Sequence, residues 1–171
     1  MPLRARRFGD DINSDYIISS SRKRETIDAD VLKQYLMEGV DPGFAASVRP
    51  NDVIVAGKNF GCGSAMEVAA TVILAAGIRA VLAQSFARAF FRNAINNGLM
   101  PIEVDTASIT DGDSLAIRAL SSRGAAGAAV TVVNLRSGDS VVALEFPPIV
   151  RDILTSGGLV PYLRREGRFR L

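Results

Sequence analysis

The sequence predicts an α/β domain whose sheet contains both parallel and antiparallel strands. Between Asp52 and Gly98, strand-like and helix-like segments alternate, and this order implies parallel strands joined by helical crossovers. After Pro101 the pattern changes to short β-prone segments separated by turn residues, which indicates antiparallel strands. Because the 171 residues contain no repeat and no interdomain linker, we expect one domain that spans residues 1–171.

The N-terminal part of the chain predicts one strand and one helix. Residues Leu3 to Phe8 can form an opening strand, and an acidic turn that ends at Asp15 follows it. The polar stretch from Ser19 to Thr26 predicts a loop. Asp28 is suited to cap a helix, because its carboxylate can accept a hydrogen bond from a free backbone N–H group. We therefore expect a helix from Asp28 to about Glu38.

The central part predicts two strand–helix units. The apolar run Asp52 to Ala56 is expected to be a buried strand, and the first helix is expected from Ala65 to Ala76, where a glycine stops it. The second strand is expected from Arg79 to Ala83. Ser85 is expected to cap the second helix, which reaches about Gly98.

The C-terminal part predicts three antiparallel strands and a final helix. The expected strands are Ser114 to Leu120, Ala129 to Asn134 and Ser140 to Leu144, with turn residues between them. The expected helix runs from Pro148 to Thr155 and stops at a pair of glycines.

Composition limits the chemistry that the chain can carry. There is no histidine, so neither an imidazole base nor a histidine metal site is available. The single cysteine, Cys62, cannot form an internal disulfide and cannot alone hold an iron–sulfur cluster. We therefore predict that this chain binds no metal. The formal net charge is only +2, which gives no argument for a nucleic-acid ligand.

Hydropathy predicts a folded protein without membrane contact. Hydrophobic residues make up 48% of the chain, which leaves apolar surface for an interface with another subunit or with further copies of the chain. The N-terminus lacks the apolar core of a signal peptide, and the longest uncharged apolar run, Val68 to Ile78, is too short to span a bilayer. These features predict a cytoplasmic location.

The stretch Gly57 to Ser64 is the strongest pointer to function, because it is rich in glycine and joins a predicted strand to a predicted helix. It fails the phosphate-binding P-loop pattern, since Ser64 directly follows Gly63 with no lysine between them. It fits the dinucleotide fingerprint poorly, since Met66 occupies the third small position. Ser64 and Glu67 have the spacing of a capping box, so a structural role for Ser64 stays open. A catalytic Ser64 would need help from the helix N-terminus or from another subunit.

Three further motifs accompany this stretch, at Gly9 to Ile18, Ser85 to Leu99 and Gly157 to Leu163. The resemblance that these four segments carry covers almost the whole chain, in the correct order. They resemble the small subunit of 3-isopropylmalate dehydratase and homoaconitase of the archaeal type, the detached swivel domain of the aconitase family. The resemblance implies a swivelling β/β/α domain of three layers with a mixed sheet.

The resemblance also implies an activity. In this family the large subunit holds a [4Fe–4S] cluster through its own cysteines, and the small subunit supplies a serine as general base. Ser64 matches that serine, so we expect a hydro-lyase subunit that is inactive without its partner. The expected substrate is a 2-hydroxy dicarboxylic acid, foremost 2-isopropylmalate of leucine biosynthesis, with homoaconitate or 2,3-dimethylmalate as alternatives. A nucleotide-binding module that uses the glycine stretch is the alternative from another class, and an RNA-binding role for the arginine-rich C-terminal tail is a third.

The matching positions define the expected site. Ser64 is the predicted catalytic residue. The predicted substrate contacts are Gly63, Ala65, Met66 and Arg24, which falls on the substrate-contacting arginine of the loop that sets specificity. The predicted supports of the site are Asn59, Gly61, Cys62, Glu67, Arg88 and Arg92.

Two segments depart from the family pattern. The family's serine is typically followed by Ser-Arg-Glu, whereas this chain has Ala65, Met66 and Glu67. Met66 cannot supply the charge or the paired hydrogen bonds with which arginine holds a carboxylate. The specificity loop carries the charged run Arg22 to Glu25. The alternative interpretation is that these charged side chains are solvated and have no role in the site. Either a neighbouring cation compensates for the missing arginine or the substrate has changed.

Overall fold

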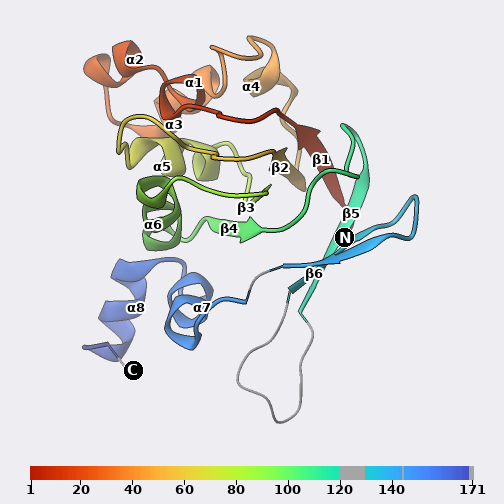
Figure 1. The fold of residues 1–171 in the computed structure, drawn as a ribbon. Helices are drawn as coiled ribbons and strands as arrows, with labels where there is room; N and C mark the ends of the chain where they lie inside the picture. Colours follow the sequence, from red (N-terminus) through yellow and green to blue (C-terminus); the bar gives the residue numbers. More distant parts are fainter. Residues whose placement is uncertain (120–129, 144, 170–171) are drawn as a thin grey trace.

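In the part of the chain that the structure describes, seven strands form one mixed sheet in the order β4-β3-β2-β1-β5-β6-β7 (Figure 1). A computed structural model describes residues 1–119, 130–143 and 145–169. The strands are β1 (Leu3–Arg7), β2 (Asp52–Ala56), β3 (Ala80–Ala83), β4 (Met100–Glu103), β5 (Ser114–Ala119), β6 (Val130–Asn134) and β7 (Ser140–Val142). The α/β class and the mixed sheet predicted from the sequence are confirmed. The predicted strand ends at Leu120, Ala129 and Leu144 lie outside the described residues.

The two halves of the sheet differ in strand direction, as the sequence predicted. Strands β1, β2, β3 and β4 are parallel, whereas β5, β6 and β7 are antiparallel to their neighbours. The halves meet where Leu3 and Arg4 of β1 pair with Leu115 and Ser114 of β5. The parallel strands all point their carboxyl ends toward one edge, which is where ligands bind in sheets of this kind.

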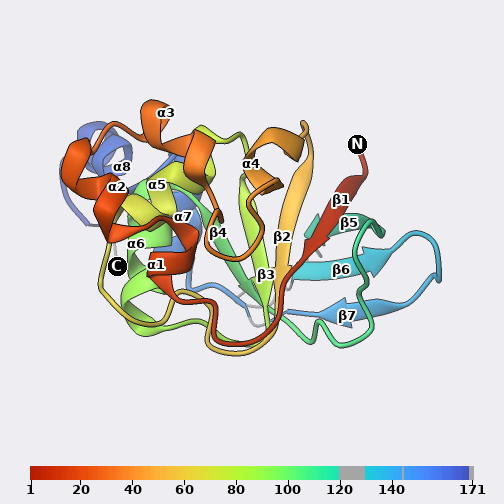
Figure 2. The ribbon, with the colours of Figure 1, turned by 90° about the horizontal axis from the view of Figure 1, so that it is seen from above.

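The parallel strands are buried on both faces, which explains their continuous apolar sequences. In β2, Ile54 and Ala56 pack against the helices, while Val53 and Val55 pack against the antiparallel half of the sheet and α7. Leu115 of β5 belongs to this second cluster. Helices, parallel strands and antiparallel strands therefore form successive layers, and Figure 2 shows most helices gathered at the end opposite to β5, β6 and β7.

Nine helical segments lie in the described part of the chain. They are α1 (Ser14–Ile17), α2 (Ser20–Glu25), α3 (Ala29–Leu32), the 3-10 helix η1 (Lys33–Tyr35), α4 (Phe44–Ser47), α5 (Val68–Ala75), α6 (Arg88–Asn97), α7 (Pro148–Thr155) and α8 (Leu159–Glu166). The predicted helix α7 has the predicted bounds. In the described residues, no helix combines the length and the apolar character needed to cross a membrane.

Two predictions about the helices were wrong in detail, and one helix was not predicted. The polar stretch after Ser19 forms α2, because the Ser19 side chain caps it by accepting a hydrogen bond from the Ser21 backbone N–H. Asp28 caps α3 as expected, but this helix ends at Leu32 and gives way to η1, and Met37 then adopts a positive φ of 63°. The sequence also gave no indication of α8, which packs with α6 and α7 around the buried side chain of Tyr162.

A buried carboxylate joins the first two strands. Asp52 is 3% exposed and accepts hydrogen bonds from Arg4 Nε at 2.7 Å and Arg6 Nη1 at 3.3 Å, and from the Arg49 backbone N–H at 3.0 Å. Burial alone would raise the pKa of Asp52, but these hydrogen bonds and charges hold its pKa below the ordinary value. The carboxylate is thus kept ionised where β1 and β2 begin to pair.

Candidate active site

The glycine loop, residues 57–64, leaves the carboxyl end of β2 and is bound on one side by residues 9–14. The Lys58 backbone N–H donates to Asp10 Oδ1 at 2.7 Å, and the Gly61 N–H donates to the Ile12 carbonyl at 2.8 Å. Asn59 Nδ2 donates to Asp11 Oδ1 at 2.8 Å. The acidic turn of the sequence is therefore one wall of the loop, held by side-chain and backbone bonds together.

The segment after β3 holds the other side of the loop. The Asn59 backbone N–H donates to Ser85 Oγ at 2.9 Å, and the Phe60 N–H donates to the Ser85 carbonyl at 3.0 Å. The Ala87 N–H donates in turn to the Phe60 carbonyl at 2.9 Å. Ser85 was predicted to cap α6, but the cap residue is Ala87 and the Ser85 side chain is used by the glycine loop instead.

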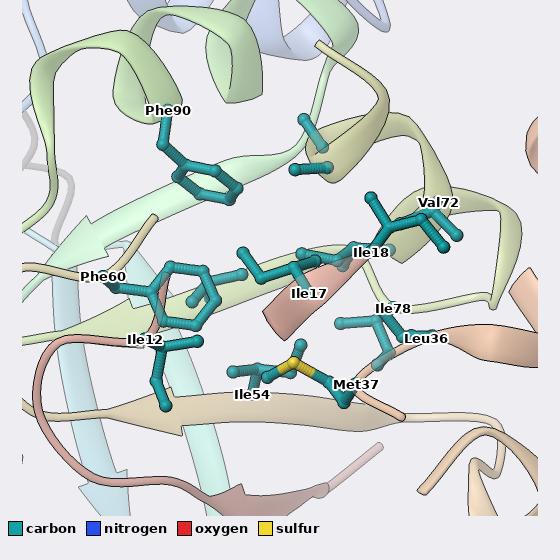
Figure 3. Close-up of a cluster of buried hydrophobic side chains, with 14 of the residues drawn as sticks. Ile12, Ile17, Ile18, Leu36, Met37, Ile54, Phe60, Val72, Ile78 and Phe90 are labelled. Atoms are coloured by element: carbon teal, nitrogen blue, oxygen red, sulfur yellow. The ribbon is translucent and has the colours of Figure 1, made fainter. Parts of the chain in front are cut away.

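Phe60 anchors the middle of the loop in the hydrophobic core. Its ring is fully buried and meets the Phe90 ring edge-on, with centroids 5.0 Å apart, as Figure 3 shows. Gly61 follows with φ of 77°, and a Cβ atom there would clash with the Cβ of Phe90. Glycine is therefore required at position 61, both by the backbone conformation and by the close approach of α6.

Ser64 lies at the end of this braced loop with its side chain exposed. Its carbonyl oxygen accepts a hydrogen bond from Ser14 Oγ at 2.8 Å, and Ser14 is itself 1% exposed. The preceding Gly63 has φ of 86°, and a Cβ atom there would clash with the Asn13 side chain. The Ser64 hydroxyl has no hydrogen-bond partner within the described ranges. The backbone of this serine is thus fixed while its hydroxyl stays available.

The prediction that Ser64 stands at a helix N-terminus was wrong. Helix α5 begins at Val68, its cap residue is Glu67, and no side chain caps it. The capping box of Ser64 and Glu67 does not form, and the predicted helix-dipole stabilisation of a Ser64 alkoxide loses its basis. Instead, residues 65 and 66 stay non-helical, and Met66 enters the core between α2 and α5.

Met66 and Glu67 are fixed by neighbouring elements. The Met66 side chain is 4% exposed, belongs to the core cluster, and its sulfur lies 3.8 Å from Ser20 Oγ of α2. A direct contact between this side chain and a substrate would require that packing to open. Glu67 is exposed, and its Oε1 accepts a hydrogen bond from Asn97 Nδ2 of α6 at 3.2 Å. Glu67 thus links the start of α5 to the end of α6.

The three cations of α2 have different surroundings. Arg22 donates two hydrogen bonds to the Glu38 carboxylate and lies over the Tyr35 ring, and the bonds to Glu38 raise the pKa of Arg22. Arg24, the predicted substrate contact, is exposed. Lys23 is half-buried and lines a cavity of about 340 Å³ together with residues 65–68.

Two other residues that were predicted to support the site, Arg88 and Arg92, make none of the hydrogen bonds that hold the glycine loop. Arg88 and Arg92 are exposed on α6 and make no hydrogen bond or ion pair with the residues that the structure describes. The bonds that hold the loop come from residues 10–14 and 85 instead, and of these the sequence analysis named only Ser85, as a helix cap. Short polar side chains in turns are the signal that could have identified them.

Cys62 is a loop residue with a free, partly exposed thiol, and its carbonyl accepts a hydrogen bond from the Ser14 backbone N–H at 2.7 Å. Within the described ranges, no group of three or more Cys, Asp or Glu side chains is placed to hold a metal ion.

Comparison with known proteins assigns the family. Residues 22–107 match the model of a family described as the aconitase C-terminal domain. The chain belongs to the aconitase family. The match includes the glycine loop and the crossovers from β2 to β3 and from β3 to β4, and the aconitase-type swivel fold predicted from the four motifs is confirmed.

Relatives of nearly the same length show to which group within the aconitase family the chain belongs. The chain is 44% identical to the 3-isopropylmalate dehydratase small subunit of Moorella thermoacetica, over 93% of this chain and 92% of the relative. It is 43% identical to the methanogen homoaconitase small subunit of Methanocaldococcus jannaschii, over 95% and 91%. A crystal structure of 3-isopropylmalate dehydratase from Methanocaldococcus jannaschii superimposes with a TM-score of 0.83 at 39% identity, covering 97% of this chain and 94% of that chain. This aconitase-family chain is therefore a small subunit of a hydro-lyase of the isopropylmalate dehydratase and homoaconitase group.

Proposed function

We propose that the chain works with a large subunit to interconvert 2-isopropylmalate and 3-isopropylmalate by removal and re-addition of water. The name of the relative from Moorella thermoacetica supports this substrate. Homoaconitate is the competing substrate, because a relative of nearly equal identity is named for it, and 2,3-dimethylmalate is a further candidate. The small-subunit names of these relatives support a large partner.

The observation that carries the proposal is the state of Ser64. Its hydroxyl is exposed and has no partner in the described part of the chain, while the Ser14 hydroxyl holds its carbonyl oxygen at 2.8 Å. A positioned and unpaired hydroxyl at a surface can take part in chemistry at an interface with a second chain.

In this proposal Ser64 Oγ takes the proton from the carbon next to the one that carries the hydroxyl group, and gives it back when water is re-added. A free serine hydroxyl is too weak an acid to be ionised near neutral pH. Helix α5 begins only at Val68, so its N-terminus is not directly at Ser64. We therefore expect the charge that stabilises the alkoxide to come from the large subunit.

The family implies a [4Fe–4S] cluster, which is held by several cysteine thiolates. Cys62 is the only cysteine of this chain, so the residues present do not fit a cluster. We infer that the large subunit holds it. The predicted cytoplasmic location stays a prediction.

The test is co-expression with a large subunit of the family, followed by steady-state kinetics on the candidate malates. Ser64→Ala should lower kcat by about 10²- to 10⁴-fold without changing the melting temperature. The matched control is Ser137→Ala, an exposed serine in the turn between β6 and β7, which should keep full activity. Full activity in Ser64→Ala would remove Ser64 from the mechanism. An inactive wild-type pair on all three substrates would refute the proposed function.

A further inference from the structure

A small apolar pocket opens between β4, α6 and the segment that enters α7. Its volume is about 240 Å³, which is less than the about 300–1,000 Å³ usual for sites of cofactors and small ligands. Two of its rings, Phe91 and Phe146, lie 6.4 Å apart from centroid to centroid. The apolar lining consists of Phe91, Pro101, Phe146, Pro147 and Val150. A pocket of this size suits one apolar side chain of a polypeptide.

Two carboxylates, Glu103 and Glu145, complete the lining of this pocket. Glu103 is half-buried and Glu145 is exposed, and neither side chain makes a hydrogen bond or an ion pair with a residue that the structure describes. No cation is among the described lining residues. A partly desolvated carboxylate without a partner is costly, and a cation placed beside it removes part of that cost. The pocket therefore suits an apolar side chain that is accompanied by a positive charge.

The pocket lies at the free edge of the sheet, since β4 pairs with β3 alone in the described part of the chain. The Met100 and Val104 backbone N–H groups donate to carbonyl groups on the β3 side at 3.1 Å and 2.9 Å, so the main-chain groups of Pro101 face the free edge. Proline has no N–H group with which to bond a further strand. Insertion of a side chain is therefore favoured over the addition of a strand at this edge.

The end of the chain has the character that this pocket requires. Phe169 is 53% exposed, and Arg168 before it is exposed and has no hydrogen bond or ion pair within the described ranges. The Phe169 ring lies 6.2 Å from the Tyr162 ring, from centroid to centroid, and does not line the pocket. Figure 1 and Figure 2 show the C-terminus separated by α7 from the segment that enters this helix. The chain thus does not fill its own pocket in this structure.

We propose that two copies of this chain exchange their C-terminal tails. Phe169 of each copy enters the pocket of the other, and Arg168 pairs with Glu103 there, while Glu145 adds to the negative potential of the rim. Because the exchange is reciprocal, it closes a dimer with twofold symmetry and does not continue into a filament. One aromatic side chain buries about 150–250 Å², so two tails cover far less than the about 1,200 Å² of a stable interface. We therefore expect a dimer that dissociates on dilution.

Sedimentation equilibrium of the whole chain, from low micromolar to millimolar concentration, tests the dimer. Phe169→Ala should raise the dissociation constant about tenfold or more, because each dimer loses two aromatic anchors. The matched control is Val160→Ala, which shortens another exposed apolar side chain near the C-terminus and should leave the dissociation constant unchanged. A chain that stays monomeric at every concentration would overturn the inference, and so would equal association of Phe169→Ala and the wild type.

Charge reversal tests the pairing of Arg168 with Glu103. Glu103→Lys should raise the dissociation constant about tenfold or more, because it places a cation beside Arg168. Addition of Arg168→Glu to this variant should recover most of the lost affinity. Asp139→Lys makes the same change of charge at an exposed position in the turn between β6 and β7 and should have no effect. An equal loss in Asp139→Lys, or no recovery in the double variant, would refute the pairing.

Disulfide trapping distinguishes a second copy from the chain's own tail. Cys62 is the single cysteine, so Cys62→Ser gives a background without thiols. In this background, a Glu103→Cys chain mixed with an Arg168→Cys chain should give a linked dimer of unlike chains under oxidised glutathione. An Asp139→Cys chain in place of the Glu103→Cys chain should give none. A chain that carries both Glu103→Cys and Arg168→Cys should also give linked dimers. If it closes on itself as a monomer instead, the tail fills its own pocket and the inference is overturned.

Discussion

Replacing Gly61 by alanine tests how the glycine loop is fitted against α6. Two separate costs are expected. Gly61 has φ of 77°, a conformation that costs an alanine about 1–2 kcal/mol. In addition, the new Cβ would clash with the Cβ of Phe90, which cannot rotate away because it is fixed to the α6 backbone.

The cost of the clash with Phe90 can be separated from the cost of the backbone conformation by comparison with a second glycine. Forcing one extra carbon into a packed core costs about 1–3 kcal/mol, so Gly61→Ala should lower the free energy of unfolding by about 2–5 kcal/mol. Gly138 has φ of 82° but no atom within 4 Å of a Cβ placed there. Gly138→Ala should therefore lose only the backbone part, about 1–2 kcal/mol.

Urea unfolding of the wild type and the two variants, followed by circular dichroism, gives both differences under one set of conditions. We expect the Gly61→Ala loss to exceed the Gly138→Ala loss by about 1–3 kcal/mol. Equal losses would refute the close packing between the loop and α6, and with it the argument that this contact fixes the path of the loop toward Ser64.

Two further predictions concern the buried polar groups. Ser14→Ala removes the 2.8 Å bond to the Ser64 carbonyl, so unfolding should become easier by about 1 kcal/mol and kcat of the reconstituted pair should fall more than KM rises; an unchanged kcat would speak against this bond as a positioning device. Folding lowers the pKa of Asp52, so the ionised carboxylate adds to the free energy of unfolding. This stabilisation is fully present above the unfolded pKa of about 3.9 and is lost as the pH falls through the folded pKa. Asp52→Asn should therefore be less stable at neutral pH but lose less further stability on acidification, and parallel pH profiles of unfolding would contradict this.

Elements whose sequence pattern reflects burial were predicted well. The strand β2 has the predicted bounds because each of its five residues is buried between two layers, which leaves a continuous apolar signal. The strand β4 was missed because Pro101 lies within it. Proline is compatible with β4 because this strand is the edge of the sheet, with a neighbour on one side only.

The local signals around the site were less informative, because tertiary contacts override them. Ser85 fits a helix cap in sequence, but its hydroxyl accepts a hydrogen bond from the Asn59 backbone N–H, a residue 26 positions away. Ser64 fits a capping box, but burial of Met66 delays the start of α5 to Val68. Helix α2 contacts Met66 through Ser20, and helix propensity alone contains no information on such a contact.

The glycine loop is held in its conformation by residues that are distant in the sequence. Its bonds run to Asp10 and Ile12, almost fifty positions upstream, and to Ser85, downstream of a complete helical crossover. A peptide that contains only the residues around Ser64 would therefore not adopt this conformation. Grafting the loop onto another scaffold would fail unless β1, β2 and β3, with the segments that follow them, were transferred together. Since such distant ends must be brought together first, we expect the loop to be among the last parts of the molecule to become ordered during folding.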